Sequence, residues 1–213
     1  MVKFNGLECQ DRFAYALLKD IKDGFYIDCC CQHAIVANNT YIFDEELKWK
    51  GLGFDRYTSA PCCGPFNWDT LRTGKFIQTD VCNDTFSQIL LDNVSKDIIV
   101  DYVSIDVDDN GGINHGWNCL PRLINGGIRF KVMTLEHELY TQGDSVRLPT
   151  RILLEALGYR RLFSDVLLDA TSQSFEDWWI NPKYFGENIH QLLQNNITWL
   201  NYNKCIEIIE SVT

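Results

Sequence analysis

The chain has 213 residues and a mass of 24.6 kDa, which is long enough for one domain with its own hydrophobic core. Its 29 acidic residues outnumber 19 basic ones, and the net charge of -10 disfavours nonspecific binding to nucleic acid or anionic membranes. No apolar run approaches the roughly 18 residues that cross a bilayer. The chain shows no apolar signal core, and three of its nine cysteines stand in a row, so we predict a reduced, cytoplasmic protein.

Apolar spacing in the first quarter of the chain predicts alternating helices and strands. Residues 7–22 have apolar side chains at three- and four-residue intervals, which is typical of a helix. Residues 25–31 form a short apolar run that we interpret as a buried strand. A helix is expected over residues 35–50 and should end at Gly51, followed by a second strand over 51–55.

The alternation continues, and then the pattern changes. Partly β-branched runs at 75–80, 98–107 and 129–136 predict three more strands, with room between them for crossover helices. The next helix should begin near Pro149 and end at Gly158. Only five residues join the runs at 159–168 and 174–180, so these should form an antiparallel hairpin.

These elements predict an α/β fold with a doubly wound, mostly parallel sheet of about seven strands and helices on both faces. The last hairpin is antiparallel, and the ligand crevice lies at the carboxyl ends of the parallel strands. We assign residues 1–182 to this Rossmann-like domain and residues 183–213 to a C-terminal helical extension of it.

Every predicted parallel strand ends at or beside an acidic residue. The acids are Asp28, Asp55, Asp80, Asp106 with Asp108, and Glu136. A single aspartate at a strand end often caps the next helix, but five successive cases favour a ligand site. The acid after the second strand suits ribose hydroxyls, and the acid after the third could accept from the exocyclic amine of adenine.

Several segments, in order, resemble the FkbM-type methyltransferases, a branch of the S-adenosylmethionine-dependent class I Rossmann-like enzymes. The most specific are VDYVSIDVDD at 100–109, FKVMTLEHE at 130–138 and FEDWW at 175–179. The similarity extends from Cys9 to Pro182. It implies a methyltransferase that uses S-adenosylmethionine, with a hydroxyl of a sugar or small molecule as the acceptor.

The resemblance also implies roles for individual positions. Asp28 and the segment from Cys30 to Ala34 would surround the methionine portion of the cofactor, and Asp55 would bind the ribose hydroxyls. The remaining matched positions are Asp80 and Val81 beside adenine, and Asp106 and Asp108 with Glu136 and His137 on the acceptor side.

The first loop departs from the family pattern, because Cys30 and Ala34 replace its two glycines. Glycine there permits a positive φ and lets the cofactor approach the backbone closely. A second hypothesis is therefore a Rossmann-like binding or scaffold protein that has lost cofactor binding.

Methyl transfer to oxygen needs a base, and His137 is the candidate, with His33 as second choice. A structural histidine is the equal alternative for His137. Asp106, Asp108 and Glu136 could instead hold a magnesium ion. We predict no zinc site, because the cysteine spacing does not fit one, and we expect Cys29 and Cys31 to share one face of the chain, opposite Cys30.

Overall fold

A computed structural model describes residues 2–60, 64–107, 115–168 and 172–213. Its main sheet has seven strands in the order β5-β2-β1-β6-β7-β9-β8. The strands are β1 (Phe25–Cys29), β2 (Lys50–Asp55), β5 (Lys75–Gln78), β6 (Val100–Ile105), β7 (Phe130–Glu136), β8 (Arg160–Leu167) and β9 (Ser174–Ile180). The first five are parallel, and β9 is antiparallel to both of its neighbours. The predicted fold class is confirmed, including the antiparallel hairpin.

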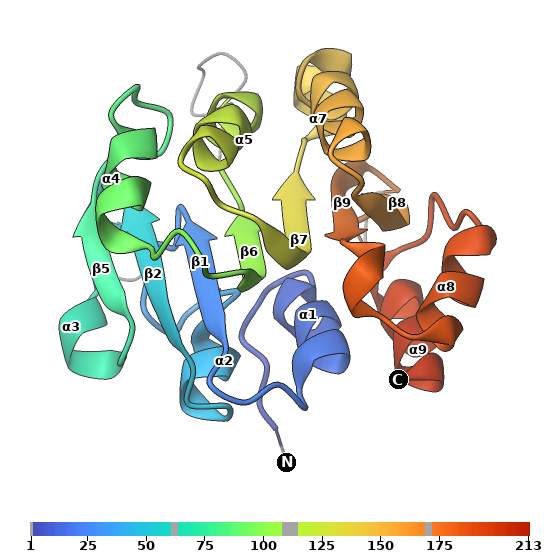
Figure 1. Ribbon diagram of the computed structural model, residues 1–213, viewed down its shortest axis with the longest axis horizontal. Coiled ribbons are helices and arrows are strands. Elements are labelled where there is room, and N and C mark those ends of the chain that lie inside the picture. Colours follow the sequence, from blue (N-terminus) through green and yellow to red (C-terminus); the bar gives the residue numbers. More distant parts are fainter. Residues whose placement is uncertain (1, 61–63, 108–114, 169–171) are drawn as a thin grey trace.

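Helices cover both faces of this sheet (Figure 1). One core cluster packs β-strand side chains against α4 (Phe86–Asn93), α5 (His115–Asn125) and α7 (Asp144–Ala156). The other packs them against α1 (Gln10–Leu18), α2 (Tyr41–Glu45), α8 (Glu187–Gln194) and α9 (Tyr202–Val212). The short elements are α3 (Trp68–Leu71), α6 (Leu139–Gln142), η1 (Pro182–Tyr184) and a two-stranded hairpin of β3 (Ser59–Ala60) and β4 (Gly64–Pro65). In the part of the chain that the structure describes, no helix is long and apolar enough to span a membrane.

The aromatic side chains of the last hairpin belong to the core. Trp178 stacks on Phe13 of α1 with ring centroids 4.5 Å apart, and it meets Phe163 of β8 edge to face at 5.6 Å. Phe175 and Trp179 are buried as well. The contacts of Trp178 with Phe13 and Phe163 hold the N-terminal helix against the antiparallel end of the sheet.

The predicted helix over 35–50 is wrong for most of its length, because only α2 (Tyr41–Glu45) is helical. Asn38, Asn39 and Thr40 use their side chains to bond the ends of β1 and β6 instead. Gly51 does not end a helix but lies inside β2, opposite Tyr26 of β1. A Cβ at Gly51 would come within 2.4 Å of the Tyr26 ring, so this glycine allows close packing.

The predicted start of the helix before β8 is also wrong. α7 begins at Asp144, so Pro149 lies inside the helix rather than in its first turn. The buried side chains Val146, Thr150 and Leu154 make one stripe at four-residue spacing that extends upstream past the proline. Ser145, whose carbonyl loses its partner at Pro149, is exposed, so water can satisfy it.

The C-terminal helical segment is divided. Residues 195–201 interrupt it between α8 and α9 and run alongside β8. Ser164 donates its backbone N–H to Ile197 at 3.0 Å, and Leu167 donates to Leu200 at 2.8 Å. The apolar face of α9 then packs into the core on the α1 side. The division at residue 182 stays a prediction.

Candidate functional site

Four of the acids predicted at strand ends lie in a row at one edge of the sheet. Asp28 and Asp55 are in β1 and β2, Asp106 follows β6, and Asp80 follows β5. These four strands are adjacent in the order β5-β2-β1-β6. Since parallel strands end at the same edge, the four acids lie along the edge where the sequence predicted a ligand crevice. Asp108, predicted to be catalytic, lies outside the described residues.

The loop after β1 has the backbone of a glycine turn without the glycine. Cys30 has φ 68° and Gln32 has φ 47°, both in the left-handed region. The N–H groups of Cys30 and Cys31 both donate to the carbonyl of Phe54, at 2.8 and 3.1 Å. A residue with a Cβ is therefore held in a conformation that costs about 1–2 kcal/mol.

This turn also corrects the expected arrangement of the three thiols. Cys29 packs in the core cluster under α4 and α5, with Cys30 partly buried against it, whereas Cys31 packs in the cluster on the other side. Cys29 and Cys31 therefore do not share a face, because the positive φ at Cys30 ends the strand alternation. Burial raises the pKa of all three thiols, which disfavours the nucleophilic thiolate.

Glycine at this turn should be tolerated better than in the strand before it. We expect Cys30→Gly to leave the free energy of unfolding unchanged or raise it by up to about 1 kcal/mol, because relief at positive φ offsets the greater entropy of the unfolded chain. Cys29→Gly, which removes a buried thiol from β1, should cost about 1 kcal/mol or more. Urea unfolding of both variants measures the difference, and equal losses would contradict the interpretation.

Asp55 ties the ends of β1 and β2 together. Its carboxylate accepts from the backbone N–H of Gln32 at 3.0 Å and of Tyr57 at 2.8 Å. Burial raises the pKa of Asp55 even though these hydrogen bonds oppose the change. Asp80 has a similar local bond from the N–H of Cys82 at 2.8 Å, and Val81 is buried. Both acids thus have turn-stabilising contacts in addition to their predicted roles.

Asn38 and Thr40, which belong to the polar segment before α2, enclose Asp28, which is only 2% exposed. Its carboxylate accepts from Thr40 Oγ1 at 2.7 Å and Asn38 Nδ2 at 3.2 Å. Asn39 Nδ2 lies between Ser104 Oγ at 3.2 Å and Asp106 Oδ2 at 3.1 Å. Burial raises the pKa of Asp28 to about 7, although the hydrogen bonds from Thr40 and Asn38 oppose this change.

The raised pKa gives Asp28 a definite effect on stability. Because its pKa is about 7 folded and 3.8 unfolded, the folded protein keeps a proton that the unfolded chain loses, and stability falls as pH rises through this window. Asp28→Asn should remove a pH-dependent loss of up to about 4 kcal/mol. Urea unfolding between pH 4 and pH 7.5 measures it, with the exposed Asp20→Asn as control. Parallel pH profiles for Asp28→Asn and wild type would contradict the assignment.

Arg72, which sequence reasoning missed, holds the polar segment at Asn38 and Thr40 in place. Its side chain is fully buried and pairs with Asp44 at 2.6 Å. The guanidinium also donates to Asn38 Oδ1 at 3.0 Å, Thr40 Oγ1 at 3.1 Å and the Tyr26 hydroxyl at 3.0 Å. Its carbon lies 4.2 Å from the Trp68 ring centroid. Arg72 therefore fixes the residues that enclose Asp28.

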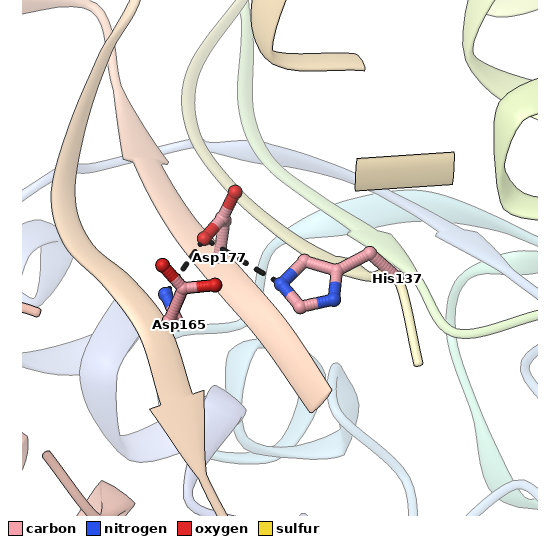
Figure 2. Close-up of side chains that lie close together, drawn as sticks. All are labelled: His137, Asp165 and Asp177. Atoms are coloured by element: carbon pink, nitrogen blue, oxygen red, sulfur yellow. Dashed lines mark hydrogen bonds and ion pairs between the residues drawn. The ribbon is translucent and has the colours of Figure 1, made fainter. Parts of the chain in front are cut away.

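His137, the predicted base, directly follows β7 and is 1% exposed. Figure 2 shows its ring beside Asp177 of β9, with Asp165 of β8 next to that carboxylate. His137 Nε2 is 3.6 Å from Asp177 Oδ1, longer than a hydrogen bond, and neither ring nitrogen has a hydrogen-bond partner among the residues described. No hydrogen bond joins the His137 ring to Asp106 among the residues described, and Asp106 instead accepts from Asn39 in the segment before α2.

Two arginines of α7 neutralise the carboxylates beside His137. Arg151 forms a two-pronged pair with Asp177, through Nε at 2.8 Å and Nη2 at 2.7 Å, and also reaches Asp165 at 2.9 Å. Arg147 contacts Asp165 at 2.7 Å. Burial alone would raise the pKa of Asp177, but Arg151 and His137 together hold it below the usual value.

The strand irregularity at Asp165 explains how this acid reaches Arg151, which also pairs with Asp177. Asp165 has φ 53° and lies where the pairing of β8 with β9 shifts register. Such a bulge redirects a side chain out of strand alternation. No sequence motif predicted the contact of Arg151 with these two acids. It depends on the geometry of the bulge and on α7, which is separated from β9 along the chain.

His137, Asp165 and Asp177 place potential metal-ligand atoms within 4.8 Å of one another. Their charges argue against a cation there. Two carboxylates already face two guanidinium groups, so a divalent ion would leave uncompensated positive charge in a buried place. We therefore interpret this group as an ion-pair cluster.

Comparisons with known proteins do not identify a family for this chain. No family model matches this chain, and no curated protein matches it. Among solved structures, human methyltransferase-like protein 13 in complex with SAH is 12% identical, with 88% of this chain and 86% of that chain covered and a TM-score of 0.45. Similarity at this level assigns no activity to this chain.

Proposed function

We propose that this protein is an S-adenosylmethionine-dependent methyltransferase of the FkbM type that methylates a hydroxyl of a sugar or another small molecule. The observation that carries the proposal is the row of acids Asp80, Asp55, Asp28 and Asp106 along the edge of four adjacent parallel strands. An acidic crevice suits a positively charged sulfonium. The family assignment rests on the sequence resemblance.

The loop after β1 is compatible with a cofactor. Its left-handed turn has the backbone shape that glycine would give, and the Cys30 side chain packs toward the core under α4 and α5. In this proposal Asp28 and Cys30 border the methionine portion, Asp55 binds the ribose, and Asp80 with Val81 borders adenine. The cofactor, when bound, supplies an activated methyl group.

The chain itself would supply positioning and a base. His137 accepts the proton of the acceptor hydroxyl in this proposal, because an imidazole can act as a general base and neither of its ring nitrogens has a hydrogen-bond partner among the residues described. Asp177, held ionised by Arg151, would then stabilise the imidazolium. Asp106 lies on the acceptor side, and with Glu136 it offers oxygen ligands should magnesium take part. Activity that persists in EDTA would exclude the metal.

A second candidate function is a binding or scaffold module that no longer takes the cofactor. The burial of Asp28, whose carboxylate already accepts two side-chain hydrogen bonds, favours it. Every cysteine that the structure describes is a free thiol, which for either function supports the proposed cytoplasmic location.

Calorimetric titration with S-adenosylmethionine distinguishes the two. The enzyme hypothesis expects binding that Asp55→Ala weakens at least about tenfold and that the exposed-site control Asp69→Ala leaves unchanged. Cys30→Gly should bind equally well or better. No binding up to millimolar cofactor would refute the enzyme hypothesis. Transfer of a labelled methyl group to any pooled glycan or metabolite fraction would refute the scaffold hypothesis.

A further inference from the structure

A cleft lies at the opposite edge of the sheet from the acids of the candidate site, where β8 begins and β9 ends. It has a volume of about 900 Å³ and is bordered by the end of α7, the start of β8, the turn at η1, and α8. Figure 1 shows these elements beside one another at the antiparallel end of the fold. The acids of the candidate site end their strands at the other edge, so the two places are distinct.

The cleft carries positive charge in a protein whose net charge is -10. Arg160, Arg161 and Lys183 supply this charge, with Glu155 as the one lining acid. Arg161 pairs with Glu155 at 2.6 Å. Among the ion pairs formed by the described residues, none includes Arg160 or Lys183, and both side chains are exposed. Two cationic groups are therefore left for an anion.

Arg160 and Lys183 also make contacts within the protein. Arg160 Nη1 donates to the carbonyl of Tyr159 at 2.7 Å and to that of Glu155, in the last turn of α7, at 3.3 Å. These bonds use one nitrogen and fix the guanidinium, so less side-chain entropy is lost when Nε and Nη2 bind a ligand. Lys183 also has a contact that positions its side chain, because its Nζ lies over the Tyr184 ring, 4.7 Å from the ring centroid.

The other walls indicate what accompanies the anion. Leu157 and Leu193 supply apolar surface, and Asn181 and Gln194 supply amides. The volume is in the usual range for small-molecule pockets, roughly 300–1,000 Å³. Arginine binds phosphate through paired N–H groups, and lysine adds a point charge.

We propose that this cleft binds a small molecule that carries phosphate beside an apolar or ring portion, at about the size of a nucleotide. The proposal is independent of methyl transfer. Arg160 and Lys183 bind the phosphate, while Leu157 and Leu193 contact the remainder.

Calorimetric titration of the full chain with ATP, pyrophosphate and inorganic phosphate tests the site. We expect ATP to bind more tightly than pyrophosphate, and Lys183→Glu and Arg160→Glu each to weaken ATP binding at least about tenfold. Lys96→Glu, an exposed change of equal charge elsewhere, should have no effect. Thermal unfolding checks that each variant is folded, and Lys183→Glu tests the proposal if loss of the α7 contacts destabilises Arg160→Glu.

Adenine nucleotides could also enter the crevice at the other edge, so two further arms separate the sites. Saturating S-adenosylmethionine and Asp55→Ala should both leave ATP binding at this cleft unchanged. Absence of binding by all three probes would overturn the proposal. So would ATP binding that survives Lys183→Glu, or that Lys96→Glu weakens equally.

Discussion

Arg72→Met should lower the free energy of unfolding by about 3–5 kcal/mol, because a methionine of similar length leaves the buried Asp44 carboxylate without its charged partner. Asn38, Thr40 and Tyr26 would lose a shared donor at the same time. The loop that encloses Asp28 should loosen, so S-adenosylmethionine binding, if present, should weaken as well. Urea unfolding and calorimetric titration measure the two effects.

Two further variants show whether the expected loss of stability comes from the ion pair and hydrogen bonds of Arg72. Arg129→Met changes an exposed arginine and should cost less than about 0.5 kcal/mol. Arg72→Lys keeps the charge but cannot replace the planar set of donors, so its loss should be intermediate. A loss below about 1 kcal/mol for Arg72→Met would show that the network contributes little beyond packing.

Arg151→Met is the second change with a large expected effect, again about 3–5 kcal/mol at pH 7. It removes the two-pronged partner of the buried Asp177 and one of the two arginines at Asp165. Without Arg151 the buried Asp177 carboxylate would lose a charge that lowers its pKa, while burial would still raise it. Circular dichroism during urea unfolding gives the loss.

The effect of Arg151→Met should depend on pH. In the wild type the pKa of Asp177 is depressed, so its stabilisation is present above the unfolded value near 4 and is lost as pH falls below that value. The difference between wild type and variant should therefore shrink in acid. Replacing both partners, as in Arg151→Met with Asp177→Leu, should cost less than the two single losses added together. A difference that stays constant from pH 3 to pH 8 would contradict the charge explanation.

Sequence reasoning predicted the sheet well because its signals are local. Each parallel strand is a short apolar run, and five linking residues leave only a hairpin between β8 and β9. The acids at the strand ends were predictable for the same reason, since Asp55 and Asp106 occupy fixed places after such runs. Helix boundaries were less predictable: Pro149 resembles a first-turn residue, yet the buried stripe of α7 continues through it.

The partners inside the candidate site could not be predicted, because they depend on tertiary contacts. Arg72 lies far along the chain from Asp28 and reaches its loop only when β5 and β1 join one sheet. His137 was identifiable as a histidine at a strand end. Its neighbour Asp177, however, depends on the pairing of β7 with β9. The site assignments themselves stay predictions until cofactor binding is measured.

The segment at 195–201 has a consequence for the solubility of the chain. A sheet has two borders, and here one belongs to β5, which is only four residues long and begins with a lysine. The other belongs to the longer β8, whose outer N–H groups at Ser164 and Leu167 are satisfied by Ile197 and Leu200. Open strands of that length invite pairing between molecules. This segment thus covers the edge strand most prone to aggregation, and losing it should favour fibrous or domain-swapped assemblies over the native fold.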